Sequence, residues 1–307
     1  MTETRVFESS NSFLSFIERE PSFRNLTKDG GAAFLWYQLV AKHLCSAAYE
    51  MGAINDMKAA LTAFYRDHPN ETGVSILELV VQEYRADAAI VLYTDAQYKI
   101  SMILNKALWS QDLDTLYNLR AYVHDLSDQL CHNEEVQLQP RDAVFHLYHG
   151  RHMSKIDLEH LMAASKGSLI CINGYLSTSK SEDVAKRYAH EVLFDITYNP
   201  SRLISVHAAD VSQKSAHPLE QEVLFNLNSV FELGDIENDV NADVIPKQII
   251  RVFLTATDKG SEILNRYIEI KKSERCENQG TTIANLLAIM GEYSKVSFKQ
   301  GYLAIYS

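Results

Sequence analysis

Two glutamates lie two positions apart, at Glu220 and Glu222, directly before the apolar run Val223-Leu224-Phe225. If this stretch is a strand, both carboxylates point to one face while Val223 and Phe225 face the core. Like charges at that spacing repel each other, so a folded protein keeps such a pair mainly where chemistry requires it. The pair is a candidate carboxylate site, and the alternative is a solvated strand edge with two exposed acids.

Hydroxyl groups form a second candidate at Ser177-Thr178-Ser179, where a predicted strand runs into a predicted helix. Hydroxyls are common in turns and at helix starts, so a turn with a helix cap is the alternative interpretation. A third candidate lies at the end of an earlier predicted strand, where His149 precedes Gly150. A functional hypothesis depends on whether these three segments meet in the folded chain.

Several familiar catalytic motifs are missing from the sequence. It contains no glycine-rich phosphate loop of the Rossmann or P-loop type, no His-Glu-x-x-His zinc helix and no Gly-x-Ser-x-Gly nucleophile motif. His146, His149 and His152 lie close together, but on a strand His146 points away from His149. We therefore expect no three-histidine metal site and no metal cofactor.

The composition of the chain argues against some classes of binding partner and some cellular compartments. The 307 residues carry a formal net charge of -11, which argues against nucleic acid or a membrane surface as the partner, because both need a basic surface. The four cysteines are widely spaced, which favours a reducing compartment over a disulfide framework. The polar start and the lack of a long apolar run predict a cytoplasmic protein, with secretion as an effector left open.

Apolar spacing predicts a helical first part and a strand-rich second part. Predicted helices of the first part cover residues 32–51, 55–68, 74–84, 94–108 and 112–130. Predicted strands of the second part cover residues 143–148, 168–175, 192–197, 203–207, 223–233 and 249–255, with helices at 154–164, 179–188 and 263–272. The fold class is therefore α+β, with a helical lobe over 1–135 and a mixed core over 136–307, packed as one unit.

Taken in order, the three candidate segments resemble the mono-ADP-ribosyltransferases that carry an Arg, a Ser-Thr-Ser and a Glu-x-Glu motif. The resemblance also includes Leu92-Tyr93-Thr94, the stretch 104–108 and the helix through Tyr188, and it covers most of residues 85–235. It implies an ADP-ribosyltransferase-type β-sandwich core with an NAD cleft. The preceding helices look like the N-terminal part of multidomain invertebrate members, which implies a possible C-terminal repeat region in a longer parent chain.

The resemblance implies transfer of ADP-ribose from NAD to an arginine of a target protein, with release of nicotinamide. Glu222 would stabilise the oxocarbenium-like ribose in the transition state, and Ser177 would orient Glu222. Glu220 would contact the acceptor arginine. The implied NAD-binding residues are His149, Gly150, Arg151, Ser177, Thr178, Ser179 and Tyr188, with Tyr188 stacked on the nicotinamide ring.

One position departs from the resembled family, which has an arginine where this chain has His149. The poly-ADP-ribose polymerase and diphtheria-toxin type uses His-Gly at that place to hold the NAD ribose, and Arg151 would supply some of the missing positive charge. A histidine provides one hydrogen bond instead of the arginine fork. Three alternatives therefore stay open: an inactive fold that binds NAD, ADP-ribose or a protein, an NAD glycohydrolase, and an interaction scaffold built on the N-terminal helices.

Overall fold

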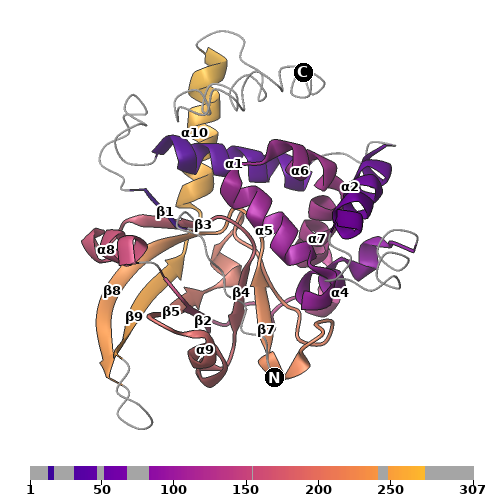
Figure 1. Ribbon diagram of the computed structural model, residues 1–307. Helices are drawn as coiled ribbons and strands as arrows, with labels where there is room; N and C mark the ends of the chain where they lie inside the picture. The colour runs from indigo at the N-terminus through magenta and orange to yellow at the C-terminus, as the bar shows by residue number, and fades with distance from the viewer. Residues whose placement is uncertain are drawn as a thin grey trace.

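A computed structural model describes residues 13–16, 31–46, 52–67, 83–153, 155–240 and 248–273. Figure 1 shows most of the helices of the first part gathered above the sheet, with helix α10 (Lys259–Ser273) returning beside α1 (Gly31–Ser46). The second part contributes nearly all of the strands. The predicted α+β organisation, with a helical N-terminal lobe, is therefore confirmed.

The helical lobe is held together by apolar stripes that face one shared core. Its α-helices after α1 are α2 (Ala53–Asp67), α4 (Ala89–Thr94), α5 (Ile100–Ser110), α6 (Leu113–Asn118) and α7 (Arg120–His132). Leu35 and Leu39 of α1, like Leu126 and Leu130 of α7, are buried at helical spacing. The same core includes strand residues such as Leu224, so the lobe packs directly on the sheet.

The start of α5 differs from the prediction. The predicted helix over 94–108 was expected to begin at Thr94, but the Thr94 hydroxyl donates back to the carbonyl of Ile90 within α4 (3.0 Å). Asp95 instead caps the single 3₁₀ turn η4 (Ala96–Tyr98) by accepting from the Gln97 amide (3.0 Å). Lys99 then adopts a left-handed conformation (φ 56°), and α5 begins only at Ile100.

The described strands form one nine-stranded sheet in the order β1-β3-β8-β9-β5-β2-β4-β7-β6, in which only the β5–β9 pair is parallel. Their bounds are β1 (Phe13–Phe16), β2 (Phe145–Arg151), β3 (Leu169–Ile172), β4 (Leu176–Ser179), β5 (Val192–Tyr198), β6 (Ala208–Asp210), β7 (Glu222–Phe225), β8 (Val230–Val240) and β9 (Gln248–Ala256). Neighbours in the sheet are mostly far apart in sequence, so the order is set by tertiary packing.

The sheet curls over its own apolar core. The rings of Phe225 in β7 and Phe231 in β8 lie 5.3 Å apart, although four strands separate β7 from β8 in the sheet order. In a flat sheet these two strands would be roughly 24 Å apart, because neighbouring strands are spaced by about 4.8 Å. The inner core therefore joins both halves of the sheet, as in a sandwich, while the ladder of strands stays continuous.

Two short helices flank the strands near the candidate site. Helix α8 (Lys155–Ala163) follows β2, and helix α9 (Glu182–Tyr188) packs against β2 and β4. Ala185 and Ala189 are buried with Leu193 and Ile249 in a small cluster of their own. The sheet is thus covered by the helical lobe on one part of its surface and by α9 on another (Figure 1).

Three predicted strands have different bounds in the structure. The strand expected at 203–207 begins at Ala208, because Asp258 accepts from the amides of Ile204 and Ser205 (2.8 and 2.9 Å) and holds this segment outside the ladder. The strand expected at 223–233 is two strands, since Asn228 turns the chain with a left-handed φ of 68°. The strand expected at 168–175 ends at Ile172, and β4 starts at Leu176.

The predicted cap of α9 is also shifted. Ser181 occupies the N-cap position, whereas Ser179 belongs to β4 and its hydroxyl accepts from the Ser181 amide (3.0 Å).

The helix predicted over 74–84 lies outside the described residues except for its last two positions, which are not helical. The helices predicted at 154–164 and 263–272 correspond to α8 and α10.

Candidate active site

Three adjacent strands carry most of the predicted site residues. The sheet order places β4 between β2 and β7, and Ser179 of β4 pairs with Tyr148 of β2 and with Glu222 of β7. The sheet order therefore brings three residues that are distant in sequence onto neighbouring strands, namely His149, Ser177 and Glu222. The three segments singled out in the sequence do meet in the folded chain.

The Glu222 carboxylate is buried, with 7% of the residue exposed, and both of its oxygens accept hydrogen bonds. Ser177 Oγ donates to Oε1 (2.6 Å), and Ser215 Oγ donates to Oε2 (3.1 Å). The Ser215 oxygen accepts in turn from the His217 amide (3.1 Å). The carboxylate is therefore fixed at the start of β7 as an oriented anion.

Ser215 is a site residue that the sequence analysis did not identify. It lies in the segment between β6 and β7, seven positions before Glu222, and no spacing pattern marks it. The Ala216 amide donates to Thr94 Oγ1 (3.3 Å), and Lys214 Nζ lies 2.8 Å from a carboxylate oxygen of Glu135. The helical lobe therefore helps to hold the segment that supports the buried glutamate.

Glu220 does not lie on the strand with Glu222, in contrast to the prediction. It ends the 3₁₀ turn η7 (Pro218–Glu220), and Gln221 follows in a left-handed conformation (φ 49°). The kink places the two glutamates in different elements, so they do not share one strand face. The Glu220 side chain accepts a hydrogen bond from the Tyr188 hydroxyl (2.7 Å) at the end of α9.

Thr178 and Ser179 use their hydroxyls to fix the backbone around the glutamates. Thr178 Oγ1 donates to the carbonyl of Val223 (2.7 Å), and Ser179 Oγ donates to the carbonyl of Glu220 (2.7 Å). The Lys180 amide also donates to the Gln221 carbonyl (3.2 Å). Both hydroxyls therefore support the position of the carboxylates, and their predicted contact with NAD stays a prediction.

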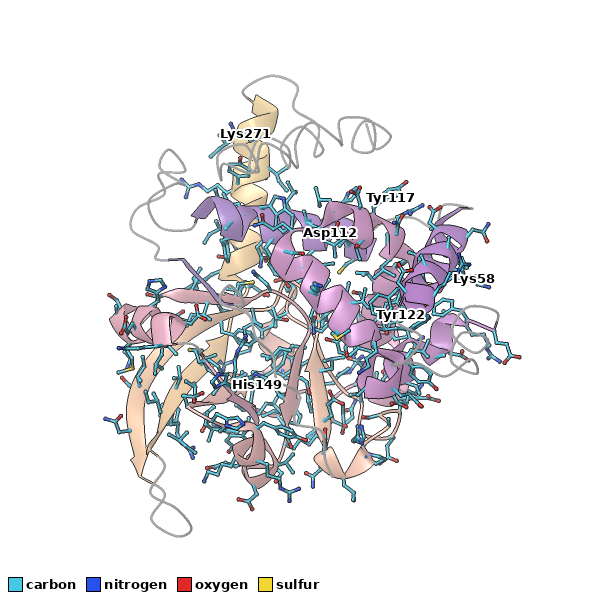
Figure 2. The ribbon with its side chains drawn as sticks, in the orientation of Figure 1. Lys58, Asp112, Tyr117, Tyr122, His149 and Lys271 are labelled. Atoms are coloured by element: carbon cyan, nitrogen blue, oxygen red, sulfur yellow. The ribbon has the colours of Figure 1, made fainter. Side chains whose placement is uncertain are left out.

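His149 is half-buried in the strand layer, where Figure 2 labels it beneath the helical residues Asp112 and Tyr122. Its Nδ1 lies 2.7 Å from the carbonyl oxygen of Ser177, and its ring stacks on Phe194 at 6.1 Å. Burial, together with the positive charge of Arg151, lowers the pKa of His149 to about 4. The ring is thus neutral near pH 7, with its proton on Nδ1 and an acceptor at Nε2.

Gly150 allows α9 to approach β2. A Cβ at this position would lie 2.0 Å from the Ala185 carbonyl oxygen and 2.5 Å from the Ala189 amide nitrogen. Only glycine permits this contact without a shift of the helix or the strand. The predicted role of Gly150 in NAD binding stays a prediction, and its packing role is evident from the geometry.

Arg151 is the cation nearest to His149 along β2. Burial lowers the pKa of its guanidinium, and the negative charge of Asp157 in α8 acts in the opposite direction. Because a guanidinium ordinarily loses its proton only far above neutral pH, the group keeps its charge near pH 7. Arg151 thus places a positive charge beside a neutral histidine.

Comparison with known proteins gives similarity at the level of the fold. No model of a protein family matches the sequence, and no curated protein matches it. Solved structures do match. Plx2a, an ADP-ribosyltransferase toxin from Paenibacillus larvae, is 16% identical, with a TM-score of 0.44 over 66% of this chain and 96% of that one. The eucaryotic mono-ADP-ribosyltransferase ART2.2 is 16% identical, with a TM-score of 0.39 over 69% and 92%. C3stau2 from S. aureus, solved with NAD, is 19% identical, with a TM-score of 0.42 over 57% and 88%.

The arrangement is suited to stabilising a developing positive charge. A carboxylate fixed by two hydroxyl donors cannot turn away from a cation that forms beside it, so little reorganisation is needed during reaction.

Among the described residues, no three histidine, cysteine, aspartate or glutamate side chains are grouped to bind a metal ion. No described helix is long and apolar enough to cross a membrane.

Proposed function

We propose that this protein is an NAD-dependent mono-ADP-ribosyltransferase that modifies a protein side chain, with arginine as the acceptor. The observation that supports this most directly is the Glu222 carboxylate, held at 2.6 Å by Ser177 and at 3.1 Å by Ser215. An oriented, buried anion fits a reaction with an oxocarbenium-like transition state. In this proposal residues 136–307 form the transferase core and residues 1–135 support it as one packed unit.

The reaction breaks the bond between the nicotinamide nitrogen and the ribose carbon of NAD. The bonding electrons leave with the nitrogen, which neutralises the positive ring, and the ribose carbon takes up positive charge. Glu222 stabilises that charge and holds a ribose hydroxyl. A guanidinium nitrogen of the acceptor then bonds to the carbon and gives up a proton to solvent, so that ADP-ribosyl-arginine and nicotinamide result.

Several other residues have defined roles in this proposal. His149 Nε2 accepts a hydrogen bond from a ribose hydroxyl, because its Nδ1 proton is engaged by Ser177. Arg151 supplies positive charge for the phosphates of NAD. Glu220 receives the acceptor guanidinium through two parallel hydrogen bonds. Tyr188, which is 52% exposed, offers its ring to nicotinamide.

The test is nicotinamide release and labelling by radiolabelled NAD, measured for the wild type and for Glu222→Gln. We expect Glu222→Gln to lower both activities about 100- to 1,000-fold, because one preorganised electrostatic contact is removed from the transition state. Glu220→Gln is the matched control, since it removes a neighbouring carboxylate and should lower transfer to arginine while NAD hydrolysis continues. A wild-type protein that releases no nicotinamide would contradict the proposal.

The alternative is a binding module that retains the fold and recognises NAD or ADP-ribose without chemistry. The neutral His149 favours it, because a ring with a pKa of about 4 supplies no charge where the resembled family has an arginine. Calorimetric titration with NAD separates the two proposals. Binding without nicotinamide release would support the module, whereas binding together with release would support the enzyme.

A further inference from the structure

Tyr188 and Glu220 form a contact that neither the resemblance nor the proposed reaction requires. The Tyr188 hydroxyl donates to Glu220 Oε1 at 2.7 Å, across the gap between α9 and the turn before β7. Building on the proposed transferase, we propose that Tyr188 is a positioning residue. Its hydroxyl aims Glu220 at the guanidinium acceptor and so sets how much ADP-ribose goes to the acceptor instead of to water.

The backbone of Glu220 is already fixed by other residues. Ser179 Oγ donates to its carbonyl (2.7 Å), the Glu220 amide donates to the carbonyl of His217 (3.0 Å), and Gln221 follows in its left-handed conformation. These contacts leave the side chain with several possible rotamers, because a glutamate on a partly exposed turn has three rotatable bonds. The Tyr188 hydroxyl is placed to select one of them.

Tyr188 can act as a fixed donor because its helix is anchored at both ends. At its start, the Glu182 carboxylate pairs with the guanidinium of Arg251 in β9 and, within the helix, with Lys186 Nζ (2.8 Å). At its end, the α9 backbone rests on Gly150 at a distance that excludes any side chain there. The tyrosine therefore links the acceptor glutamate to β2, the strand that carries His149.

The hydrogen-bond geometry leaves room for the acceptor. Each carboxylate oxygen has two acceptor positions, so one tyrosine donor on Oε1 leaves Oε2 and the second position on Oε1 available for a guanidinium fork. An aimed carboxylate favours attack by the guanidinium, which needs a defined direction. Water needs no such direction, so loss of the hydroxyl should shift the products toward hydrolysis.

The experiment uses the full chain, NAD and agmatine, a small guanidino acceptor. Tyr188→Phe keeps the ring and removes the hydroxyl. We expect the KM for agmatine to rise about tenfold and the ratio of transfer to hydrolysis to fall by a similar factor, as for loss of one hydrogen bond to a charged group. The KM for NAD is measured alongside, because a change in NAD binding raises that KM and lowers transfer and hydrolysis together, which leaves their ratio unchanged.

Two controls test whether the effect is specific to the hydrogen bond between Tyr188 and Glu220. Tyr117→Phe removes a tyrosine hydroxyl from α6 in the helical lobe and should change neither KM. In the background of Glu220→Gln, Tyr188→Phe should have much less effect, because the partner of its hydrogen bond has changed. A thermal melt that overlays the wild type shows that Tyr188→Phe is folded, as expected for a half-exposed ring.

Three results would overturn the inference, and they differ in what else they affect. An unchanged ratio of transfer to hydrolysis would exclude the role of Tyr188 alone. An equal loss of both activities, with a higher KM for NAD, would assign the hydroxyl to NAD binding instead. Absence of nicotinamide release from the wild type would overturn the proposed transferase and this role with it.

Discussion

Two serine hydroxyls, Ser127 and Ser177, each form the centre of a hydrogen-bond network, and the two networks differ in charge. Ser127 of α7 donates to the amide oxygen of Asn226 (2.9 Å), whereas Ser177 of β4 donates to the carboxylate of Glu222 (2.6 Å). The first network lies between the helical lobe and the sheet. The second lies between β4 and β7, where NAD is proposed to bind.

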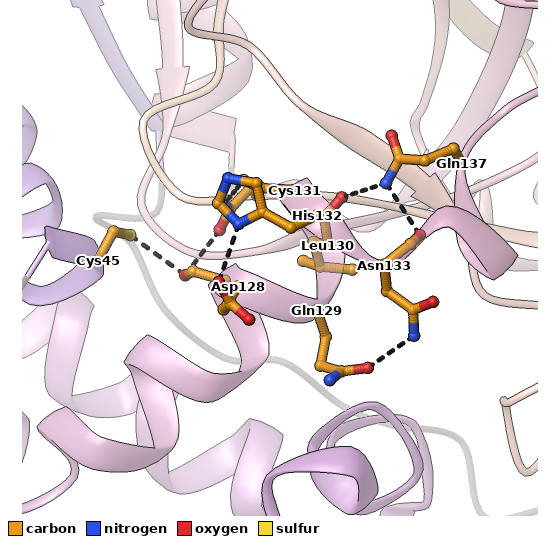
Figure 3. A network of polar contacts seen from close by, with 10 residues as sticks. Cys45, Asp128, Gln129, Leu130, Cys131, His132, Asn133 and Gln137 are labelled. Atoms are coloured by element: carbon orange, nitrogen blue, oxygen red, sulfur yellow. Dashed lines mark hydrogen bonds and ion pairs between the residues drawn. The ribbon is translucent and has the colours of Figure 1, made fainter. Parts of the chain in front are cut away.

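The Ser127 network consists of neutral groups from several elements. Ser127 Oγ lies 3.2 Å from Cys45 Sγ of α1 and 2.9 Å from the hydroxyl of Tyr175 before β4. Asn226, in the turn after β7, also donates from Nδ2 to Cys131 Sγ (3.1 Å). Figure 3 labels both Cys45 and Cys131. Burial raises the pKa of Cys45 to about 12, so the thiol stays neutral.

The difference in charge indicates that the Ser127 network contributes to stability and that the Ser177 network contributes to the proposed reaction. Neutral groups that satisfy one another in the interior fix how two layers pack, and they offer no charge to a substrate. Around Ser177 the hydroxyls instead hold an anion, whose burial is costly unless it is paired or serves a reaction. We therefore expect changes near Ser127 to lower stability and changes near Ser177 to lower activity.

The largest effect on stability is expected for Asn226→Ala. The change leaves the Ser127 hydroxyl and the Leu227 amide without the oxygen that accepts from both (2.9 and 2.8 Å). Two unsatisfied buried donors should lower the free energy of unfolding by about 3 kcal/mol, as measured by urea denaturation. The kcat per folded molecule should stay the same.

Asn238→Ala, at an exposed position of β8, is the matched control and should change stability by less than about 0.5 kcal/mol. If Asn226→Ala lowered kcat per folded molecule as strongly as Glu222→Gln does, the separation between the two networks would be wrong. The helical lobe would then contribute directly to chemistry.

A smaller effect, on activity, is expected for Ser177→Ala. The lost contact is a short hydrogen bond to a carboxylate, which contributes about 2 kcal/mol, so kcat should fall about 30-fold. Ser215→Ala removes a longer contact (3.1 Å against 2.6 Å) and should lower kcat only about fivefold. Nicotinamide release and thermal melts, measured on the same samples, give both quantities.

Ser127→Ala is the control for these two variants, since it removes a hydroxyl from the neutral network. It should lower the melting temperature and leave kcat unchanged. The opposite pattern, with a lower melting temperature for Ser177→Ala and unchanged kcat, would make the buried glutamate a structural anion.

Local patterns in the sequence predicted much of this architecture. Strands β2, β5 and β9 and helices α1, α2 and α10 lie within a few residues of their predicted bounds, because alternation and helical spacing depend on near neighbours. The three candidate segments were also identified from their residue types. The resemblance implied one of the side-chain contacts, that of Ser177 with Glu222, whereas the contact of His149 with the Ser177 backbone was not predicted.

The features that the sequence did not predict depend on contacts between residues that are distant in sequence. The strand expected from Val223 to Leu233 is broken by a turn at Asn228, which lets Phe225 and Phe231 meet across the curled sheet. Glu220 lies off the strand face because Gln221 adopts a left-handed conformation. The sequence has no glycine at this position that would have predicted such a conformation. Ser215 has no local pattern at all, since only the fold brings its hydroxyl to Glu222.

The smallest expected effect is the pH dependence of stability that His149 contributes beside the Ser177 network. Its pKa of about 4 in the folded protein is below the usual 6.5, so protons bind more readily to the unfolded chain. Stability from this residue is complete above pH 6.5 and is lost as the pH falls toward 4. For a half-buried ring we expect a loss of about 1 kcal/mol relative to His149→Gln, measured by urea denaturation across that range. Nδ1 and Nε2 chemical shifts of a neutral ring at pH 5.5 would support this prediction, and a titration near 6.5 would mean that the folded protein does not lower the pKa of His149.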